Sequence, residues 1–303
     1  ENDYEIKIRR DRWDKRYTYG NIFYIKNTEF GGIIGRKKIN TEKDTISLYG
    51  RTWRGKLDKK IIRPPEGQDY RKVSGELNAV LNTIVTEQFN DYFVVSQNDT
   101  GVSVTNFQFD RYCTLLTGII KMLKSVGYKL HIEYIQQERG QPGYVELSAV
   151  PIVDYSDAKE LSQDSRLNFV FDEMKNGVNH LICLGKGELQ DRQVIDLYVG
   201  LNGSIGTTQY YTGIKEVTDT YKDTSSESDE LEEKGREKLR ELMNKTSFSM
   251  DVESLGIEVE IGDIVGGRDY VTGMYAAKPI AKKIYKVEGG KTSLEYEIEG
   301  DDS

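Results

Sequence analysis

Hydrophobic and polar positions near the start of the chain alternate with the short period of β-strands. Runs rich in Ile, Phe, Leu and Tyr occupy residues 21–26, 31–34 and 45–49, and Gly residues border each run. Short strands separated by turns are typical of a small β-barrel or a sandwich. The Pro-Pro pair at Pro64 cannot continue a central strand and marks a boundary. We therefore expect an N-terminal β-barrel domain over residues 1–73.

The hydrophobic period then changes to that of helices. An apolar helical stripe follows Ser74, which we expect to be the N-cap residue, and a second helix with one apolar face follows Asp110. Alternating positions predict two strands after these helices, at 128–135 and 144–150. Together these elements predict an α+β module over residues 74–155, in which two helices pack on a small sheet.

The rest of the chain returns to strands, apart from one charged helix. Strands are predicted at 166–171, 180–185, 193–199, 257–261, 279–288 and 292–298, the last two paired across Gly289-Gly290, and the helix is predicted near 228–245. We expect these elements to form a second β-barrel domain over residues 156–303. The predicted fold class is therefore α+β, with two small β-barrels flanking the α+β module.

Composition excludes several classes of protein. Hydrophobic residues make up 37% of the chain and charged residues 30%, as in a folded, soluble protein. No apolar run reaches the roughly 20 residues that cross a bilayer. Cys113 and Cys183 are the only cysteines and allow at most one disulfide. This is typical of a protein made in a reducing cytoplasm.

Two histidines, His131 and His180, limit the possible chemistry further. A zinc site of three histidines cannot form. His131 alternates with apolar residues on its predicted strand, so we expect it to face solvent. The segment around Asp263 does not match a calcium-binding loop and is predicted to be a Gly-containing turn between strands. Dinucleotide and P-loop fingerprints are absent from the sequence, and we expect no cofactor and no metal.

Cys113 and His180 are the alternative catalytic pair. Cys113 lies near the start of a predicted helix, whose dipole favours a thiolate. His180 opens the strand His-Leu-Ile-Cys-Leu-Gly-Lys-Gly, which resembles the histidine strand of a family of peptidoglycan cysteine peptidases. The Asp-Cys-Ser-Gly motif of that family is absent, because the order here is Asp-Arg-Tyr-Cys-Thr. A buried structural Cys is therefore the preferred interpretation.

Two further patterns have a chemical and a structural interpretation. The carboxylate pairs Glu258/Glu260 and Asp172/Glu173 could serve a glycosidase, which needs an acid and a nucleophile or base. A chain with 50 acidic residues offers such pairs by chance. Aromatic residues interleave with Lys and Arg in residues 12–26, a pattern that can bind single-stranded nucleic acid. Strand aromatics that face a core give the same pattern.

Charge is divided unevenly along the chain. Residues 1–73 hold 19 Lys and Arg against 11 Asp and Glu, a net charge of +8. The remaining residues hold 23 against 39, a net charge of −16. Scattered surface charge is the simplest interpretation. Opposite charges on two parts of one chain also fit head-to-tail docking between subunits.

Four strings of residues stand out in the sequence. They are Gly50-Arg-Thr-Trp-Arg-Gly-Lys-Leu57 continuing to Pro65, Asn179 to Gly187 followed by Asp191-Arg192, the helix Glu232 to Leu242 after an acidic loop, and Glu260 to Asp269 followed by Thr272-Gly273. Together they span most of the chain. In the same order, they resemble segments of the tail hub proteins of siphophages and related prophages.

The resemblance implies a baseplate hub, a structural protein of the virion. Three copies would form a pseudo-sixfold ring from two β-barrels each, so the implied state is a homotrimer. The implied partners are distal tail and tail-tube proteins, and a tail-tip or cell-wall-degrading component. DNA would pass through the ring without sequence-specific binding as it enters the host cell. The implied location is the virion tail, after synthesis in the bacterial cytoplasm, and the family has no catalytic residues in this region.

Two alternative functions, from other classes of protein, are also compatible with the sequence. One is a peptidoglycan hydrolase associated with the tail, acting through Cys113 and His180 or through a carboxylate pair. The other is a monomeric module that binds carbohydrate or nucleic acid.

Overall fold

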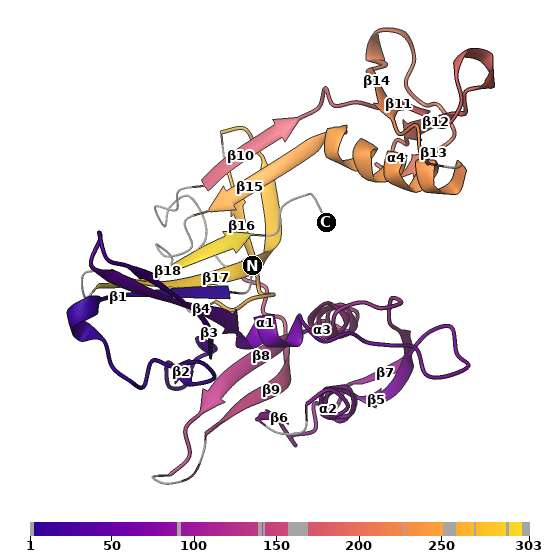
Figure 1. Ribbon diagram of the computed structural model, residues 1–303. Helices are drawn as coiled ribbons and strands as arrows, with labels where there is room; N and C mark the ends of the chain where they lie inside the picture. Colours follow the sequence, from indigo (N-terminus) through magenta and orange to yellow (C-terminus); the bar gives the residue numbers. More distant parts are fainter. Residues whose placement is uncertain are drawn as a thin grey trace. The chain divides into compact units, whose positions relative to one another are not determined.

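The computed structural model describes residues 3–89, 92–138, 141, 143–156, 169–226, 228–250, 259–269, 271–288 and 291–298 (Figure 1). The chain folds into two compact units and passes between them several times. Unit 1 consists of residues 1–154, 259–263 and 285–293, and unit 2 consists of residues 155–258, 264–284 and 294–303. The fold class is mixed α+β, as the sequence predicts.

The first sheet of unit 1 is open and antiparallel. Its strands stand in the order β1 (Asp3–Arg9), β4 (Thr45–Thr52), β3 (Gly31–Asn40), β2 (Ile22–Tyr24). Ile34, Ile46 and Leu48 are buried, and Ile6, Ile8 and Tyr17 pack against them. Among the described residues, the expected N-terminal β-barrel is therefore found only as an open sheet. Four strands, one of them only three residues long, are too few to close on themselves.

Close backbone contact holds β3 against β4. A Cβ atom at Gly50 would lie 2.1 Å from the carbonyl oxygen of Ile33 and 2.8 Å from the ring of Tyr4. At Gly32 it would lie 2.4 Å from the carbonyl oxygen of Arg51. The Tyr4 ring packs edge-on against Phe23, with centroids 4.2 Å apart. Glycine is therefore required where Tyr4 crosses the sheet.

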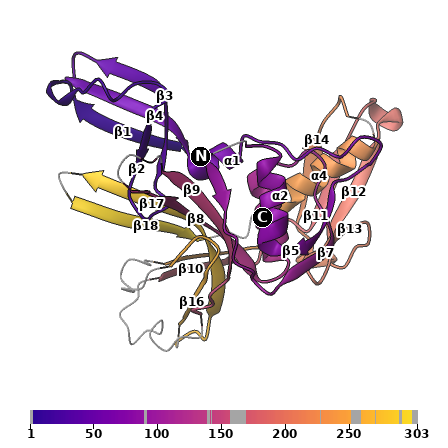
Figure 2. The ribbon, with the colours of Figure 1, turned by 90° about the horizontal axis from the view of Figure 1, so that it is seen from below.

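The second part of unit 1 packs helices against a three-stranded sheet. The helices are α1 (Trp53–Leu57), α2 (Leu77–Thr86) and α3 (Leu115–Lys124), the sheet has the order β6 (Phe93–Val95), β9 (Tyr144–Pro151), β8 (Tyr128–Ile135), and β5 (Lys72–Glu76) pairs with β7 (Ser103–Gln108) (Figure 2). Leu81, Ile119, Met122 and Leu147 are buried in one continuous core between helices and sheet. The predicted packing of two helices on a small sheet is confirmed.

Both helices begin later than the sequence predicts. Helix α2 is capped by Glu76, whose side chain accepts from the Ala79 N–H at 2.7 Å, and Ser74 lies in β5. Helix α3 is capped by Thr114 and not by Asp110. In each case another side chain stands nearer to the first free N–H groups of the helix, and that position decides the cap.

Unit 2 contains a four-stranded sheet covered by one helix. The sheet has the order β13 (Ile205–Gly206), β12 (Val194–Val199), β11 (His180–Leu184), β14 (Thr218–Lys222), and the helix is α4 (Ser228–Leu242). Leu231 and Leu239 of α4 are buried with Leu181 and Leu197 of the sheet. A Cβ atom at Gly235 would lie 2.5 Å from the sulfur of Cys183, so glycine allows the helix to approach.

In unit 2, β10 (Phe169–Met174) pairs with β15 (Lys245–Met250). A further three-stranded sheet has the order β16 (Ile264–Arg268), β17 (Tyr275–Glu288), β18 (Lys291–Ile298); residues 285–288 and 291–293 of its strands belong to unit 1 and the others to unit 2. The long strand β17 is curved (Figure 1), and its sheet is open. The predicted pairing of the last two strands is confirmed, and their Gly-Gly turn lies outside the described residues. The second predicted closed barrel is not present in the described part of the chain.

The predicted strand at 257–261 is wrong where it can be checked. Residues 257 and 258 lie outside the described residues, and residues 259–263 form a turn. Gly262 has φ +98°, the left-handed region that favours glycine, so the predicted turn around Asp263 is confirmed. The predicted boundary at residue 155 falls beside the border of unit 1. The division of residues 1–154 into two domains stays a prediction.

Within the described ranges, no helix is both long and apolar enough to span a membrane.

Replacement of Gly50 by Ala should destabilise unit 1 by about 2 to 3 kcal/mol, because the added methyl group meets backbone that cannot move away. Both Trp residues, Trp13 and Trp53, lie in unit 1, so urea unfolding followed by Trp fluorescence reports on this unit. Gly35→Ala in β3 is the matched control. Its Cβ atom would meet only the Tyr49 carbonyl oxygen, at 3.9 Å, so the change should stay below about 1 kcal/mol. Equal losses in both variants would contradict this account.

Candidate functional site

Cys113 lies in the turn before α3 and is partly buried. Its N–H donates to the carbonyl oxygen of Asp110, and its carbonyl oxygen accepts from the N–H of Ile62. Burial raises the pKa of the thiol, and the Asp110 carboxylate raises it further. The predicted activation by a helix dipole is therefore wrong, because the helix starts at Leu115 and the local environment favours the protonated thiol.

His180 lies at the start of β11, with carboxylates on both sides of its ring. Nδ1 is 2.7 Å from Oε1 of Glu216, and Nε2 is 2.8 Å from Oδ1 of Asp196. The ring also stacks on Tyr198, with centroids 4.3 Å apart. His180 belongs to unit 2 and Cys113 to unit 1, so neither unit contains both residues. The peptidase alternative stays a prediction.

The carboxylate pairs give no general acid among the described residues. Hydrogen bonds from His131 and Lys129 lower the pKa of Glu260 to about 2, so this carboxyl group is ionised at neutral pH. Glu258 lies outside the described residues. Asp172 and Glu173 are consecutive in β10, so their side chains point to opposite faces of the strand pair. In the described part of the chain, no group of three or more His, Cys, Asp or Glu side chains is placed to hold a metal ion.

The aromatic residues near the N-terminus pack mainly within unit 1. Tyr17 joins the small core of the first sheet, and Phe23 packs on Tyr4. Tyr24 stacks on Tyr134, with centroids 3.9 Å apart, and donates a hydrogen bond to Gln136. Only Tyr19 is more than half exposed, and the ammonium group of a lysine lies over its ring. These aromatics therefore do not form a row on which bases could stack.

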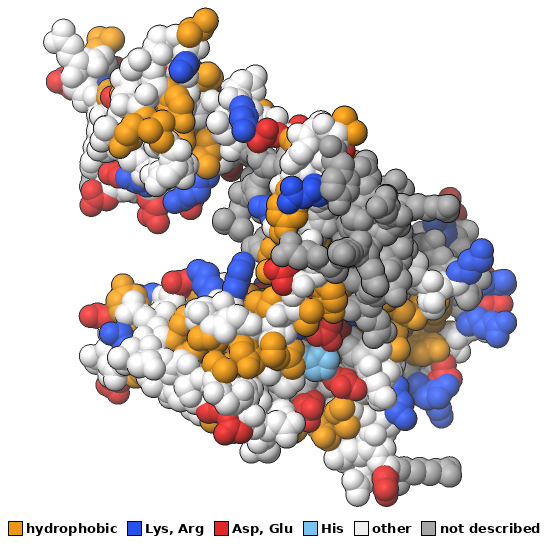
Figure 3. Space-filling view, turned by 180° about the vertical axis from the view of Figure 1, so that it is seen from behind, with side chains coloured by type: hydrophobic (Ala, Val, Ile, Leu, Met, Phe, Trp, Pro, Cys, Tyr) orange, Lys and Arg blue, Asp and Glu red, His pale blue; other side chains and the backbone are white. Residues whose placement is uncertain are grey.

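One face of the first sheet is basic. Strand pairing places Lys7 and Lys38 on either side of Ser47, and Arg36 beside Tyr49. We call the cations of this face the basic sheet surface: Lys7, Arg9, Arg36, Lys38 and Arg51. Asp3 and Glu5 lie on the same face, beside Arg51 and Lys7, and the five cations outnumber them. In Figure 3, Lys and Arg side chains gather over the strands of this sheet, at the right of the view. The positive charge of residues 1–73 is thus presented on regular strands.

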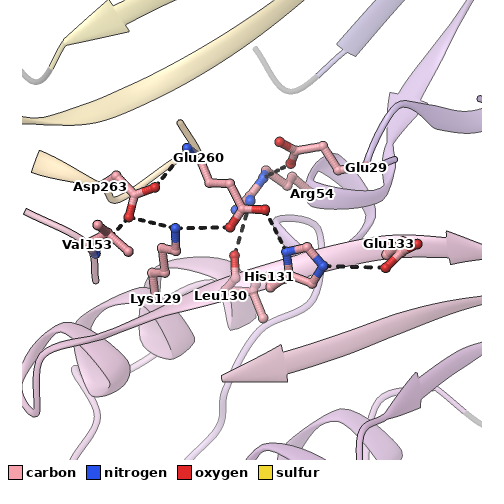
Figure 4. A network of polar contacts seen from close by, with 9 residues as sticks. All are labelled: Glu29, Arg54, Lys129, Leu130, His131, Glu133, Val153, Glu260 and Asp263. Carbon is pink, nitrogen blue, oxygen red and sulfur yellow. Dashed lines mark hydrogen bonds and ion pairs between the residues drawn. The ribbon is translucent and has the colours of Figure 1, made fainter. Parts of the chain in front are cut away.

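A second charged group lies on the outer face of β8 (Figure 4). We call it the Lys129 cluster: Glu29, Arg54, Lys129, His131, Glu133, Glu260 and Asp263. All seven residues belong to unit 1. They bring together the first sheet, α1, β8 and the returning segment Val259–Asp263. Distant parts of the sequence therefore meet through charged side chains.

Lys129 and Asp263 form the buried centre of this cluster. Nζ of Lys129 is 2.7 Å from Oδ1 of Asp263 and 3.0 Å from Oε2 of Glu260. Only 7% of Lys129 and 2% of Asp263 is exposed. Buried charges at this depth persist only when they are paired, so each of the two residues requires the other.

Asp263 also binds two backbone segments. Its Oδ1 accepts from the N–H of Val153 at 2.9 Å, and its Oδ2 accepts from the N–H of Glu260 at 2.9 Å. Val153 lies next to the point where the chain leaves unit 1, and Glu260 lies next to the point where it returns. One carboxylate therefore joins the outgoing and the returning chain.

His131 forms the partly exposed side of the cluster. Its Nδ1 is 2.9 Å from Oε1 of Glu260, and its Nε2 is 3.6 Å from Oε2 of Glu133 (Figure 4). The hydrogen bond to Glu260 raises the pKa of His131. His131 therefore faces solvent only in part, since 31% of its side chain is exposed and the segment around Glu260 packs over its strand.

Arg54 completes the cluster from α1. Its Nε donates to Oε2 of Glu29 at 2.7 Å, and its Nη2 donates to the carbonyl oxygen of Leu130 at 3.2 Å. Both charged side chains are largely buried. Arg54 belongs to the first of the four strings in the sequence, and Glu260 and Asp263 belong to the last. No sequence pattern predicts that Arg54 lies in one cluster with Glu260 and Asp263, because most of the chain separates them.

Glycines of the same strings stand at close contacts. A Cβ atom at Gly185 would lie 2.7 Å from Leu231, at Gly187 2.2 Å from the carbonyl oxygen of Asp191, and at Gly266 2.8 Å from Ser156. These distances are shorter than Cβ atoms tolerate, so a side chain at any of the three positions would disturb the local packing.

Three solved structures match nearly the whole chain. A 43 kDa tail protein of a Shewanella oneidensis prophage is 13% identical, with a TM-score of 0.45, and the match covers 99% of this chain and 90% of that one. The chain is similar to phage tail proteins. A Neisseria meningitidis tail protein matches at 15% identity and TM-score 0.39, covering 98% and 86%. A prophage tail protein of Listeria monocytogenes matches at 15% and 0.40, covering 93% and 79%. No family model and no curated protein sequence matches the chain.

Replacement of Lys129 by Met should lower the free energy of unfolding by about 3 to 5 kcal/mol, because it leaves the Asp263 carboxylate buried and unpaired. Lys121→Met is the matched control. Lys121 pairs with Asp110 on the surface, so the control should lose less than about 1 kcal/mol. Urea unfolding of both variants at neutral pH measures the difference. A loss at Lys129 no larger than that at Lys121 would show that the buried pair does not stabilise unit 1.

Proposed function

We propose that the chain is a structural hub protein of a phage or prophage tail, which assembles as a homotrimeric ring. The observation that carries this proposal is the set of four sequence strings in the order found in tail hub proteins. The structure gives these strings physical roles, since they supply the close glycine contacts and both ends of the Lys129 cluster. Residues with such close contacts stabilise the fold of the chain.

The distribution of charge supports an assembly of identical subunits. The basic sheet surface belongs to a region of net charge +8, whereas the rest of the chain carries −16. In a ring, each subunit uses two different surfaces, one toward each neighbour. A basic surface on one subunit and an acidic surface on the next would attract each other and fix their order. We therefore assign the basic sheet surface to a contact with an acidic surface of the neighbouring copy.

The proposed role is mechanical and not catalytic. The ring would close the tail tube, hold a tail-tip or cell-wall-degrading component, and contact distal tail and tail-tube proteins. DNA would pass through it without sequence-specific binding. The proposed location is the virion tail. These assignments follow from the resemblance of the four strings, together with the raised pKa of the Cys113 thiol and the engaged ring nitrogens of His180.

The native mass in solution tests the assembly. Light scattering after size-exclusion chromatography should give three times the monomer mass at low salt, and a lower average mass in about 0.5 M salt, because salt screens the proposed contact. The double variant Lys7→Glu/Lys38→Glu should weaken trimer formation by about tenfold or more at low salt. A monomer under all conditions would contradict the ring as an autonomous assembly.

The double variant Lys72→Glu/Lys215→Glu is the matched control for this experiment. It makes the same change in net charge at exposed positions outside the basic sheet surface. Its mass and salt dependence should equal those of the unmodified protein. If both double variants dissociate equally, net charge and not the basic sheet surface governs assembly.

A zymogram on purified bacterial cell walls tests the hydrolase alternative. The purified protein should leave the cell walls intact, because burial raises the pKa of the Cys113 thiol, and hydrogen bonds from His131 and Lys129 keep Glu260 ionised. Clearing that disappears in Cys113→Ala, and persists in Cys183→Ala, would overturn the hub proposal in favour of a cysteine peptidase. Cys183 is a suitable control, since it is fully buried beneath α4.

A further inference from the structure

We propose that protonated His131 holds the segment Val259–Asp263 on β8. When His131 loses its proton at higher pH, the Glu260 end of this segment loosens. The inference rests on the geometry of the Lys129 cluster and does not depend on the hub proposal. It assigns a conformational role to a histidine that no catalytic or metal-binding arrangement explains.

The first argument is the donor requirement of two carboxylates. Nδ1 of His131 lies beside Glu260, and Nε2 lies on the side of Glu133. A neutral imidazole carries only one N–H, so it can donate to one of these carboxylates but not to both. The imidazolium ion carries two. Nε2 and Oε2 of Glu133 are 3.6 Å apart, beyond hydrogen-bond distance, so this contact is an ion pair that exists only when His131 is protonated (Figure 4).

The second argument is the charge around the ring. The elements packed against this face contribute Lys129 and Glu133 from β8, and Glu146 from β9, directly opposite Glu133 in the strand register. The returning segment contributes Glu260 and Asp263. Helix α1 contributes Arg54, which pairs with Glu29 of the loop between β2 and β3. Five carboxylates thus face two permanent cations. A positive charge on His131 reduces this excess, and its loss increases the repulsion.

The third argument is that the two ends of the segment are held differently. Asp263 is held from outside the segment by Lys129 and by the N–H of Val153, and neither contact involves His131. Within the segment, the N–H of Glu260 donates to Asp263, and the Glu260 carboxylate is held by Lys129 and His131. A neutral His131 can still donate from Nδ1 to Glu260, but without the charge that strengthens this hydrogen bond. Loss of the imidazolium charge therefore weakens the hold on the Glu260 end and leaves the outer contacts of Asp263 in place.

The direction of the pH dependence follows from the two groups. The pKa of His131 is raised, so its contribution is complete below its ordinary value of about 6.5 and is lost as the pH rises through the raised value. The pKa of Glu260 is lowered to about 2, so this carboxylate stays ionised through mild acid. The contact is therefore complete below about pH 6.5 and weakens as the pH rises through the raised pKa of His131.

Hydrogen exchange of the full chain tests the proposal. The amides of Glu260 and Asp263 are hydrogen-bonded within the segment, and their protection factors can be compared at about pH 6 and about pH 9 after correction for the intrinsic exchange rate. Protection of the Glu260 amide should fall by about fivefold to tenfold, because the hydrogen bond that holds the Glu260 carboxylate loses its charge assistance. Protection in α3 should stay constant and serves as the internal reference. An unchanged ratio between the two pH values would overturn the proposal.

Two variants identify the titrating group. In His131→Gln, protection at the Glu260 amide should be low and equal at both pH values, whereas His180→Gln should keep the fall. His180 is the matched control because it also lies between two carboxylates, in unit 2. If His131→Gln does not fold, Glu260→Gln keeps the shape of the side chain but removes its charge, and the fall should shrink at least threefold. A full fall in either folded variant would show that another group is responsible.

Discussion

The carboxylate of Asp263 is the interaction on which the organisation of unit 1 depends. It binds the backbone of Val153 and of Glu260, which are the outgoing and the returning chain, and it does so while almost completely buried. Burial of this charge requires Lys129, and Lys129 in turn positions Glu260 beside His131. The turn that presents Asp263 requires Gly262 in the left-handed region. One ion pair therefore decides where the chain can leave unit 1 and where it can re-enter.

Local patterns in the sequence predict the helices and strands well, but they do not predict whether the strands close into a barrel. The apolar faces of α2 and α3, the alternation in β8 and the pairing of the last two strands all depend on neighbours in sequence, and all are found. Whether strands close into a barrel depends on how distant edges meet, and period alone does not contain that information. The same reason explains the helix caps. Glu76 and Thr114 act because of their position relative to the first N–H groups, which periodicity locates only within a few residues.

The candidate site residues show the same difference between properties set by the local sequence and properties set by packing. The sequence suggests a catalytic role for Cys113 and His180 because of the residue types, but burial beside Asp110 and the carboxylates around His180 come from packing. His131 is predicted to be exposed by alternation within its own strand. A segment 129 residues away in sequence then covers part of it. The chain has only two histidines, and each lies between two carboxylates. The sequence shows how few histidines there are, but only the structure shows this arrangement.

The passage of the chain between the units affects the order in which the protein can fold during synthesis. Domains of a growing chain generally fold as they emerge, the N-terminal one first. Here unit 1 contains residues 259–263 and 285–293, which are synthesised after nearly all of unit 2. Until then, Lys129 has neither of its partners from the returning segment. Lys129 therefore stays unpaired until this segment has been synthesised, and unit 1 can be completed only with the last strands of the chain.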